Sequence, residues 1–364
     1  MHKSAAWPLA LVYVGLIVYA SLYPFADWRD QGIAPWAFMG APMPRYWTGF
    51  DLAVNAVGYA PLGGLLALSA MRSGRVRRAV LVSTFAACLL AFSMELMQAY
   101  LPARIPSRED WLINTVGAAW GAFVVVILER LGAIDRWSQF RDRWFVAQSR
   151  GGMVLLALWP LALLFPPAVP FGLGQIMERV EEALGELLVD TPFLDWLPVR
   201  ETELQPLVPG AEMVCVILGL LIPCLLGFCV IHARLRRAAF VVAVIAAGGV
   251  ASALSAALSW GPLNAWAWLN FPVQVGMGLG MLVAMALIFV PWRASAALLL
   301  LSLGTYLSLL NQAPESAYFA QTLHAWEQGR FIRFHGLAQW LGWLWPYATL
   351  VYVLSLIWQR DTKN

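Results

Sequence analysis

The sequence predicts an all-α, polytopic helical membrane protein with about ten transmembrane helices and both termini on the cytoplasmic side. Of its 364 residues, 60% are hydrophobic and 12% are charged, whereas a soluble domain carries about 25% charged residues. Apolar runs recur along the chain, and a run of roughly 20 such residues is long enough to cross a bilayer as a helix. The composition therefore excludes an ordinary soluble protein.

Prolines mark several of the expected helix ends. Pro24, Pro102 and Pro291 stand at or just past an apolar run, where a missing backbone N–H is least costly. The run at 151–168 is the most interrupted, because it contains three prolines. The ten expected spans are, in order, 7–23, 51–71, 79–101, 110–131, 151–168, 211–231, 238–259, 270–290, 294–311 and 338–358.

The basic residues set the expected orientation. If the N-terminus is cytoplasmic, sixteen Lys and Arg residues fall on that side and eight on the other. Cytoplasmic loops are enriched in Lys and Arg, so this distribution places both termini inside. The formal net charge of +3 is then a result of membrane topology, and it gives no case for a nucleic-acid partner.

Two polar segments divide the expected spans. The basic, aromatic segment 132–150 is predicted to be an amphipathic cytoplasmic linker between a four-helix unit (1–131) and a six-helix unit (151–364). The outer loop 169–210 is acidic, and within it 174–189 has the apolar stripe of a helix lying at the outer surface. Recruitment of a cationic ligand is the alternative interpretation of that loop. The four cysteines lie inside spans without metal-ligand spacing, so no metal, cofactor or disulfide is predicted.

A polar pattern occurs twice within this apolar sequence. An acid, an amide four residues later and a glycine three residues after that share one helix face. Carboxylates and carboxamides near hydrocarbon are costly and persist where protein partners or a wet cavity satisfy them. The copies are Asp51-Asn55-Gly58 and Asp110-Asn114-Gly117.

Two later segments keep parts of this pattern. Glu212 and Gly219 retain the acid and the glycine, whereas 269–276 retains only the glycine. Transporter folds often arise by internal duplication, but matches this weak could also arise by chance.

The expected topology brings the polar residues to one depth. The second and fourth spans run from outside to inside and the third returns, so their outer turns meet. Glu95, about two turns inside the third span, is expected to be protonated or paired with Arg104 or Arg108. Asp51 and Asp110 are expected to begin their helices, where a carboxylate can cap free N–H groups. The predicted ligand-binding residues are Asp51, Asn55, Tyr59, Glu95, Gln98, Arg104, Arg108, Asp110 and Asn114. Of these, we expect Asp51, Glu95, Arg104, Arg108, Asp110 and Asn114 to share one outward-opening cavity.

A structural alternative exists for most of these residues. Asn55 and Asn114 could tie helices together through interhelical hydrogen bonds. Glycines such as Gly58, Gly63 and Gly117 would allow the helices to approach closely.

The same residues carry a family resemblance. The matching motifs are Asn55-Ala56-Val57-Gly58-Tyr59-Ala60-Pro61-Leu62-Gly63, Glu95-Leu96-Met97-Gln98, Arg104, and Ser107-Arg108-Glu109-Asp110 followed by Asn114-Thr115-Val116-Gly117-Ala118 and Gly121. Through them, roughly residues 1–131 resemble the VanZ-like family of small membrane proteins. The resemblance implies a multi-pass cell-envelope protein of the bacterial cytoplasmic (inner) membrane. It also implies a link to glycopeptide resistance, since the family's namesake is associated with teicoplanin resistance.

Three functions are compatible with the sequence. The first is a non-catalytic envelope protein whose outward-facing polar pocket binds membrane lipid head groups or a lipid-linked or glycopeptide-type ligand, with Arg104 and Arg108 holding a phosphate or carboxylate. The second is a membrane enzyme acting on a lipid-linked substrate, with Glu95 as the candidate catalytic acid or base and Gln98 orienting it. No histidine lies near this cluster in the sequence. The third is a transporter, although charged residues are almost absent from the C-terminal spans.

Overall fold

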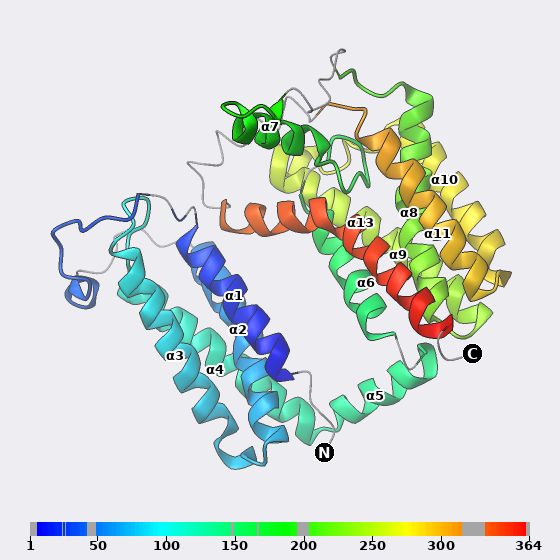
Figure 1. The fold of residues 1–364 in the computed structure, drawn as a ribbon. Coiled ribbons are helices and arrows are strands. Elements are labelled where there is room, and N and C mark those ends of the chain that lie inside the picture. The colour runs from blue at the N-terminus through cyan, green and yellow to red at the C-terminus, as the bar shows by residue number, and fades with distance from the viewer. Residues whose placement is uncertain are drawn as a thin grey trace. The chain divides into compact units, whose positions relative to one another are not determined.

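The computed structural model describes residues 6–23, 25, 27–41, 49–146, 149–165, 167–194, 204–314 and 332–361. Its contacts divide the chain into two compact units, Met1–Phe140 and Arg141–Asn364. Within the described ranges the secondary structure is helical (Figure 1), apart from one isolated β-bridge between Phe145 and Ile231. The predicted all-α class is therefore confirmed.

The first unit is built from the N-terminal helices. In chain order they are α1 (Ala6–Leu22), the 3₁₀ turn η1 (Ala37–Gly40), α2 (Gly49–Arg72), η2 (Val76–Arg78), α3 (Ala79–Gln98), α4 (Arg108–Arg130) and α5 (Ala133–Trp144), whose last residues belong to the second unit.

The second unit contains the remaining described helices. They are α6 (Arg150–Ala162), α7 (Met177–Leu188), α8 (Pro209–Val230), α9 (Arg234–Trp260), η4 (Pro262–Asn264), α10 (Phe271–Ala286), η5 (Leu287–Phe289), α11 (Trp292–Leu310) and α13 (Ile332–Asp361).

Seven helical segments of the described chain are long and apolar enough to cross a membrane: η2 with α3, α4, α8, α9, α10, α11 and α13. α1 and α6 are apolar but shorter, and the 24-residue α2 contains Pro61. α6 ends at Ala162 rather than near 168, because the Pro166-Pro167 pair that follows cannot supply helical N–H groups. A polytopic membrane protein is confirmed, while ten spans and cytoplasmic termini remain predictions.

Small residues bring α2 and α4 into backbone contact. A Cβ added to Gly117 would lie 2.2 Å from the carbonyl oxygen of Ala56, and one added to Gly121 would lie 1.9 Å from that of Ala60. Such approach is typical of membrane helices that associate through small residues. Both contacts advance together along the two helices, so α2 and α4 run parallel, as the topology predicted. Gly58 has open space around its Cα, so the expectation that it allows close helix packing was wrong.

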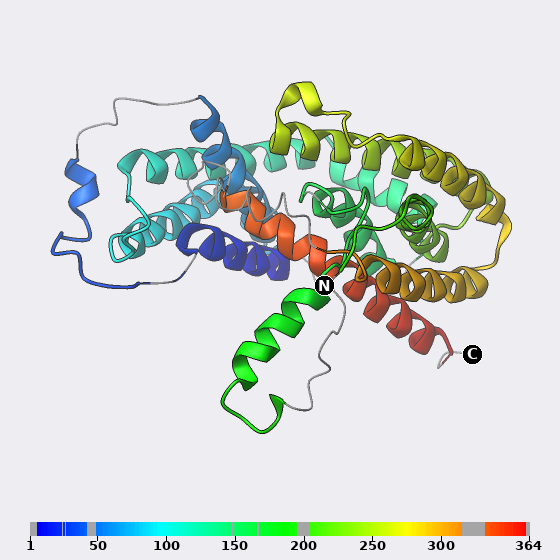
Figure 2. The same cartoon turned by 90° about the horizontal axis from the view of Figure 1, so that it is seen from above.

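α8 is the central helix of the second unit. In its most apolar stretch of 18 residues, 78% of the residues are buried. Helices α6, α9, α10 and α11 pack against it. Trp159, Phe171 and Phe228 are buried in the core around it. The amphipathic helix expected within the acidic loop is present as α7, which projects away from the bundle (Figure 2).

A buried arginine joins three elements of the second unit. The guanidinium of Arg237, at the start of α9, donates to the carbonyl oxygens of Phe228 at 2.8 Å and Ile231 at 3.2 Å, at the end of α8. It also donates to Ile288 at 3.1 Å and Val290 at 2.7 Å, beside η5. Helix C-termini leave carbonyl groups without intrahelical partners, and this side chain satisfies those of two neighbouring helix ends.

We predict that Gly121→Ala destabilises the protein and that Gly58→Ala does not. The methyl group at position 121 would collide with the backbone of α2, whereas the one at position 58 meets open space. Overpacking of this kind costs about 1–3 kcal/mol or more, and alanine is otherwise favoured over glycine in a helix. The apparent melting temperature in detergent is the measurement. Equal stability of the two variants would contradict the close α2–α4 contact.

A second prediction compares Arg237→Met with Arg234→Met. The first variant leaves carbonyl groups at the α8 and η5 ends without their donor, at about 1–3 kcal/mol for each one that stays dry. Arg234 is exposed and lies over the Phe289 ring at 5.4 Å, which is worth about 0.5–1 kcal/mol. Thermal unfolding and the yield of folded protein should fall much further for Arg237→Met. An equal loss of thermal stability in both variants would contradict the proposed role of Arg237 in holding the ends of α8 and η5.

Candidate functional site

The predicted site residues lie where α3 ends and where α2 and α4 begin. α3 ends at Gln98 rather than near 101, because backbone bonds from Tyr100 to Met97 and from Leu101 to Gln98 turn the chain. Glu95 is consequently in the last turn of α3, and the expectation that it lies two turns inside the helix was wrong. This position places its carboxyl group beside the loop that leads into α4.

Glu95 ties the end of α3 to the start of α4. Its side chain is 2% exposed, and its Oε2 accepts a hydrogen bond of 2.8 Å from the backbone N–H of Ser107. Ser107 is the N-cap of α4, so the carboxyl group holds the residue at which the next helix starts. Glu95 therefore has a structural role: it fixes the start of α4 against the end of α3.

The two arginines of the loop have different surroundings. Arg104 donates through Nε at 3.1 Å and Nη2 at 2.6 Å to the carbonyl oxygen of Tyr23, and through Nη2 at 3.4 Å to that of Ala20, at the end of α1. Arg108 lies 3.5 Å from the carbonyl oxygen of Met39, and its described ion pair, at 3.6 Å, is with Glu109 rather than Glu95. Arg104 is thus engaged in holding α1, while the 32% exposed side chain of Arg108 is the better placed to meet a ligand.

Gln98 also holds the end of α1. Its side chain is buried, and its Nε2 donates at 3.1 Å to the carbonyl oxygen of Ser21. Together with Arg104 it satisfies carbonyl groups that the last turn of α1 leaves open. Tyr59, which was predicted to line the site, is buried in the core of the unit beside Leu22 and Leu62.

One polar pair joins the two copies of the repeated pattern. Asn55 Nδ2 on α2 donates at 2.7 Å to Asp110 Oδ1 on α4. Asp110 does not begin its helix as expected: α4 begins at Arg108, and Ser107 Oγ caps it by accepting from the Asp110 N–H at 3.2 Å. Asp110 still lies in the first turn, where the helix dipole favours a negative charge. The side chain of Asp51 lies outside the described residues, so its predicted role stays a prediction.

Two buried acceptors at this end of α4 lack a full set of described partners. Asn114 is 7% exposed, and its Oδ1 accepts no hydrogen bond within the described residues. Glu109, which sequence reasoning missed, is 8% exposed. Its Oε2 accepts from Ser107 Oγ at 3.0 Å, whereas its Oε1 accepts no hydrogen bond within the described residues and lies 3.6 Å from Arg108 Nη2 in the ion pair. Buried acceptors left unpaired are costly, so Asn114 Oδ1 is the place where a donor group would gain most.

The first unit thus places most of the predicted residues around one set of helix ends. Asn55 meets Asp110, and Glu95 meets the Ser107 N-cap next to Arg108. Gln98 and Arg104 face the end of α1. The sequence signal that could have added Glu109 was its place between Arg108 and Asp110 in the first turn. Among the described residues, no group of three or more His, Cys, Asp or Glu side chains is arranged to hold a metal ion.

We expect Arg104→Gln to lower stability more than Arg108→Gln does. The first change removes charged donors from the end of α1, where each bond is worth about 1.5 kcal/mol or more. The second removes one longer contact, the 3.6 Å ion pair with the buried carboxylate of Glu109, and Ser107 Oγ still donates to that carboxylate. Thermal unfolding of the two purified variants compares them directly. If Arg108→Gln proved the more damaging, the division between an anchoring and an available arginine would be wrong.

Comparison with known proteins supports the relationship suggested by the sequence motifs. Residues 8–129 match the model of a family described as VanZ/LLP1. This segment runs from α1 to the end of α4 and covers roughly a third of the chain. No curated protein and no solved structure matches the chain. The VanZ-like resemblance of the N-terminal segment is confirmed, and the chain is a multi-pass cell-envelope membrane protein with a VanZ-like unit formed by its first four helices.

Proposed function

We propose that the VanZ-like unit is a ligand-binding module that recognises a lipid head group or a cell-wall intermediate from the outer side of the bacterial inner membrane. The observation that carries the proposal is the buried Oδ1 of Asn114, which accepts no hydrogen bond within the described residues and lies four residues beyond the Asp110 that bonds Asn55. A bound hydroxyl, amide or ammonium group would supply the donor that this oxygen lacks.

Arg108 indicates that the proposed ligand also carries an anionic group. Its guanidinium is partly exposed beside a helix N-terminus, a setting that favours anions. A guanidinium binds phosphate or carboxylate through two parallel hydrogen bonds. Hydroxyl donors together with a phosphate are the groups that a phospholipid head group or a lipid-linked sugar presents. Among envelope components, these are therefore the ligands that fit best.

The two alternative functions have weaker support. For an enzyme, Glu95 would have to exchange a proton with substrate, but it is 2% exposed and accepts the Ser107 N–H. For a transporter, a path of polar residues through the second unit would be needed, and α8, its central helix, carries one ionisable acid, Glu212, in its first turn. A link to teicoplanin resistance follows from the proposal, because a protein that binds cell-wall intermediates can change their access to a glycopeptide.

The test is Asn114→Leu, with Thr115→Val as the matched control. The first change removes the amide whose Oδ1 lacks a described hydrogen bond. The second removes a neighbouring hydroxyl, which donates within the helix to the Trp111 carbonyl oxygen at 2.8 Å. We expect both variants to fold and Asn114→Leu to lose at least tenfold of a co-purified envelope lipid, measured by mass spectrometry. Teicoplanin susceptibility of cells expressing each variant is the second measurement. A folded Asn114→Leu variant with an unchanged lipid profile would contradict the proposal.

Glu95→Gln distinguishes ligand recognition from scaffolding in the same assay. Glutamine keeps an acceptor for the Ser107 N–H, so the fold should be retained or improved. We expect the variant to lose ligand, because the ionisable centre of the site is gone. A folded variant that retains both lipid and cellular function would assign Glu95 to the scaffold alone.

A further inference from the structure

The second unit repeats features of the VanZ-like unit in the same order. Helices α8, α9 and α10 keep features of α2, α3 and α4 at a nearly constant separation of about 160 residues, the mark of an internal repeat. The corresponding features are Asp51 and Gly58 with Glu212 and Gly219, Pro61 with Pro223, Arg75-Val76-Arg77-Arg78-Ala79 with Arg234-Leu235-Arg236-Arg237-Ala238, and Gly117 and Gly121 with Gly276 and Gly280.

The interhelical contacts correspond as well. Asn270, the N-cap of α10, donates through Nδ2 at 3.0 Å to Glu212 Oε1 in the first turn of α8. This is the same amide–carboxylate link that joins α2 to α4, with the two groups exchanged between the helices. A Cβ added to Gly276 would lie 2.9 Å from Val216 Cγ1 and 3.0 Å from the Met213 carbonyl oxygen. α8 and α10 therefore run parallel in close contact, as α2 and α4 do.

The chain segment after the preceding helix shows the third correspondence. Phe25, shortly after α1, has a φ of +63°, and Phe171, shortly after α6, has a φ of +62°. Each phenylalanine follows a proline in the sequence. Positive φ is uncommon for a bulky side chain, and a shared Pro-Phe step in this conformation is hard to attribute to chance. α6, α8, α9 and α10 thus share these features with α1 to α4.

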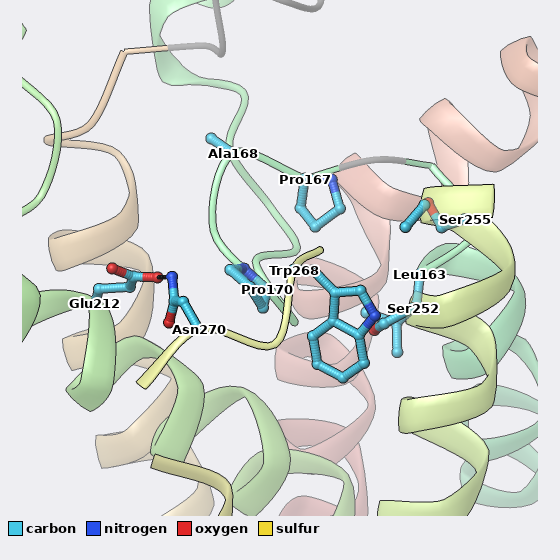
Figure 3. Close-up of a pocket in the computed structure, with 10 residues that line it drawn as sticks. Leu163, Pro167, Ala168, Pro170, Glu212, Ser252, Ser255, Trp268 and Asn270 are labelled. Atoms are coloured by element: carbon cyan, nitrogen blue, oxygen red, sulfur yellow. Dashed lines mark hydrogen bonds between the residues drawn. The ribbon is translucent and has the colours of Figure 1, made fainter. Parts of the chain in front are cut away.

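A cavity lies at the corresponding place in the second unit. Its volume is about 190 Å³, and it is formed by the segment after α6, the starts of α8 and α10, and the C-terminal end of α9 (Figure 3). In the first unit the corresponding places, the end of α1, the starts of α2 and α4 and the end of α3, carry the predicted site residues. The lining residues are Leu163, Pro167, Ala168, Pro170, Glu212, Ser252, Ser255, Ala256, Trp268 and Asn270.

The lining of this cavity differs in charge from the cluster in the first unit. Glu212 is the one charged residue among its lining residues, and no ion pair is described for it within the placed part of the chain. Trp268 lies between Pro170 and the α9 serines in Figure 3. Its Nε1 donates at 3.0 Å to the Ala265 carbonyl oxygen, and its ring packs at 5.8 Å in a T-shaped contact with Phe171 and lies 6.5 Å from the Trp266 ring. These contacts fix the position of the indole in the cavity wall.

We propose that this cavity is a second ligand site and that it binds an organic ammonium group. Glu212 supplies the negative charge that such a cation requires, and Trp268 adds aromatic surface, which also favours cations, to the lining of the same cavity. The amide of Asn270 orients the Glu212 carboxylate, and the prolines supply apolar walls for methyl or methylene groups. An anionic ligand would find no positive partner among the lining residues. The ammonium could belong to a free amine or to the head group of a lipid, and the proposal does not depend on the function of the first unit.

The experiment uses the full chain and two probes. Binding of radiolabelled choline to purified protein in detergent reports a free ammonium, with competition by tetramethylammonium and by inorganic phosphate. Lipid nanodiscs containing phosphatidylethanolamine or phosphatidylglycerol report a head group, through the lipid retained on re-purification. Glu212→Gln is the test variant, because glutamine still accepts from Asn270. Glu186→Gln, the same change on the exposed face of α7, is the control.

We expect Glu212→Gln to lose at least tenfold in affinity while Glu186→Gln binds as the wild type does. Tetramethylammonium should compete and phosphate should not. Choline binding supports a free amine as the ligand, and selective retention of phosphatidylethanolamine without choline binding supports a lipid source. Trp268→Leu should weaken binding as well, and it serves as the test variant if Glu212→Gln does not fold. Absence of both kinds of binding in the wild type, binding that survives the test variant, or competition by phosphate instead of tetramethylammonium would overturn the proposal.

Discussion

Carbonyl groups at helix ends impose the constraint on which much of this structure depends. A helix leaves its last carbonyls without partners, and in or near a membrane water cannot be relied on to satisfy them. In the first unit, Gln98 and Arg104 donate to carbonyl oxygens at the end of α1. In the second unit, Arg237 donates to the ends of α8 and η5. Each donor comes from another element, so satisfying a helix end also fixes where its neighbour lies.

This constraint separates the polar residues of the VanZ-like unit into two groups. Arg104 and Gln98 hold the end of α1 in place, and their loss should be felt first in stability; Glu95 holds the Ser107 N-cap through a bond that glutamine can also accept. Asn114 has an oxygen without a hydrogen bond among the described residues, and Arg108 has a partly exposed guanidinium with one described ion pair, to Glu109, so scaffolding explains these two less well. A ligand-binding hypothesis therefore depends on the second group more than on the number of polar residues that converge.

The sequence was enough for the fold class and for the helix ends at which the polar residues gather, but not for the partners of individual side chains. Hydropathy reports which segments are apolar and how long they are, and parallel α2 and α4 follow from the order of the helices. Hydropathy cannot distinguish Gly58, in open space, from Gly117, in contact with Ala56, because the contacts of a glycine depend on how the two helices are rotated about their axes. The end of α3 and the engagement of Arg104 with Tyr23 were missed for a similar reason: turn bonds and tertiary contacts decide them.

The correspondence between the two units shows which features are architectural and which can vary. Both units keep an amide–carboxylate bond between parallel helices, at 2.7 Å in Asn55–Asp110 and 3.0 Å in Asn270–Glu212. Because the amide and the acid have exchanged helices, the bond itself is what the arrangement needs. The residues around that bond differ: Arg108 lies near it in the first unit, and Trp268 lines the cavity in the second. The two units thus share a helix arrangement but differ in the charge of the residues near this bond, which suits them to ligand groups of opposite charge.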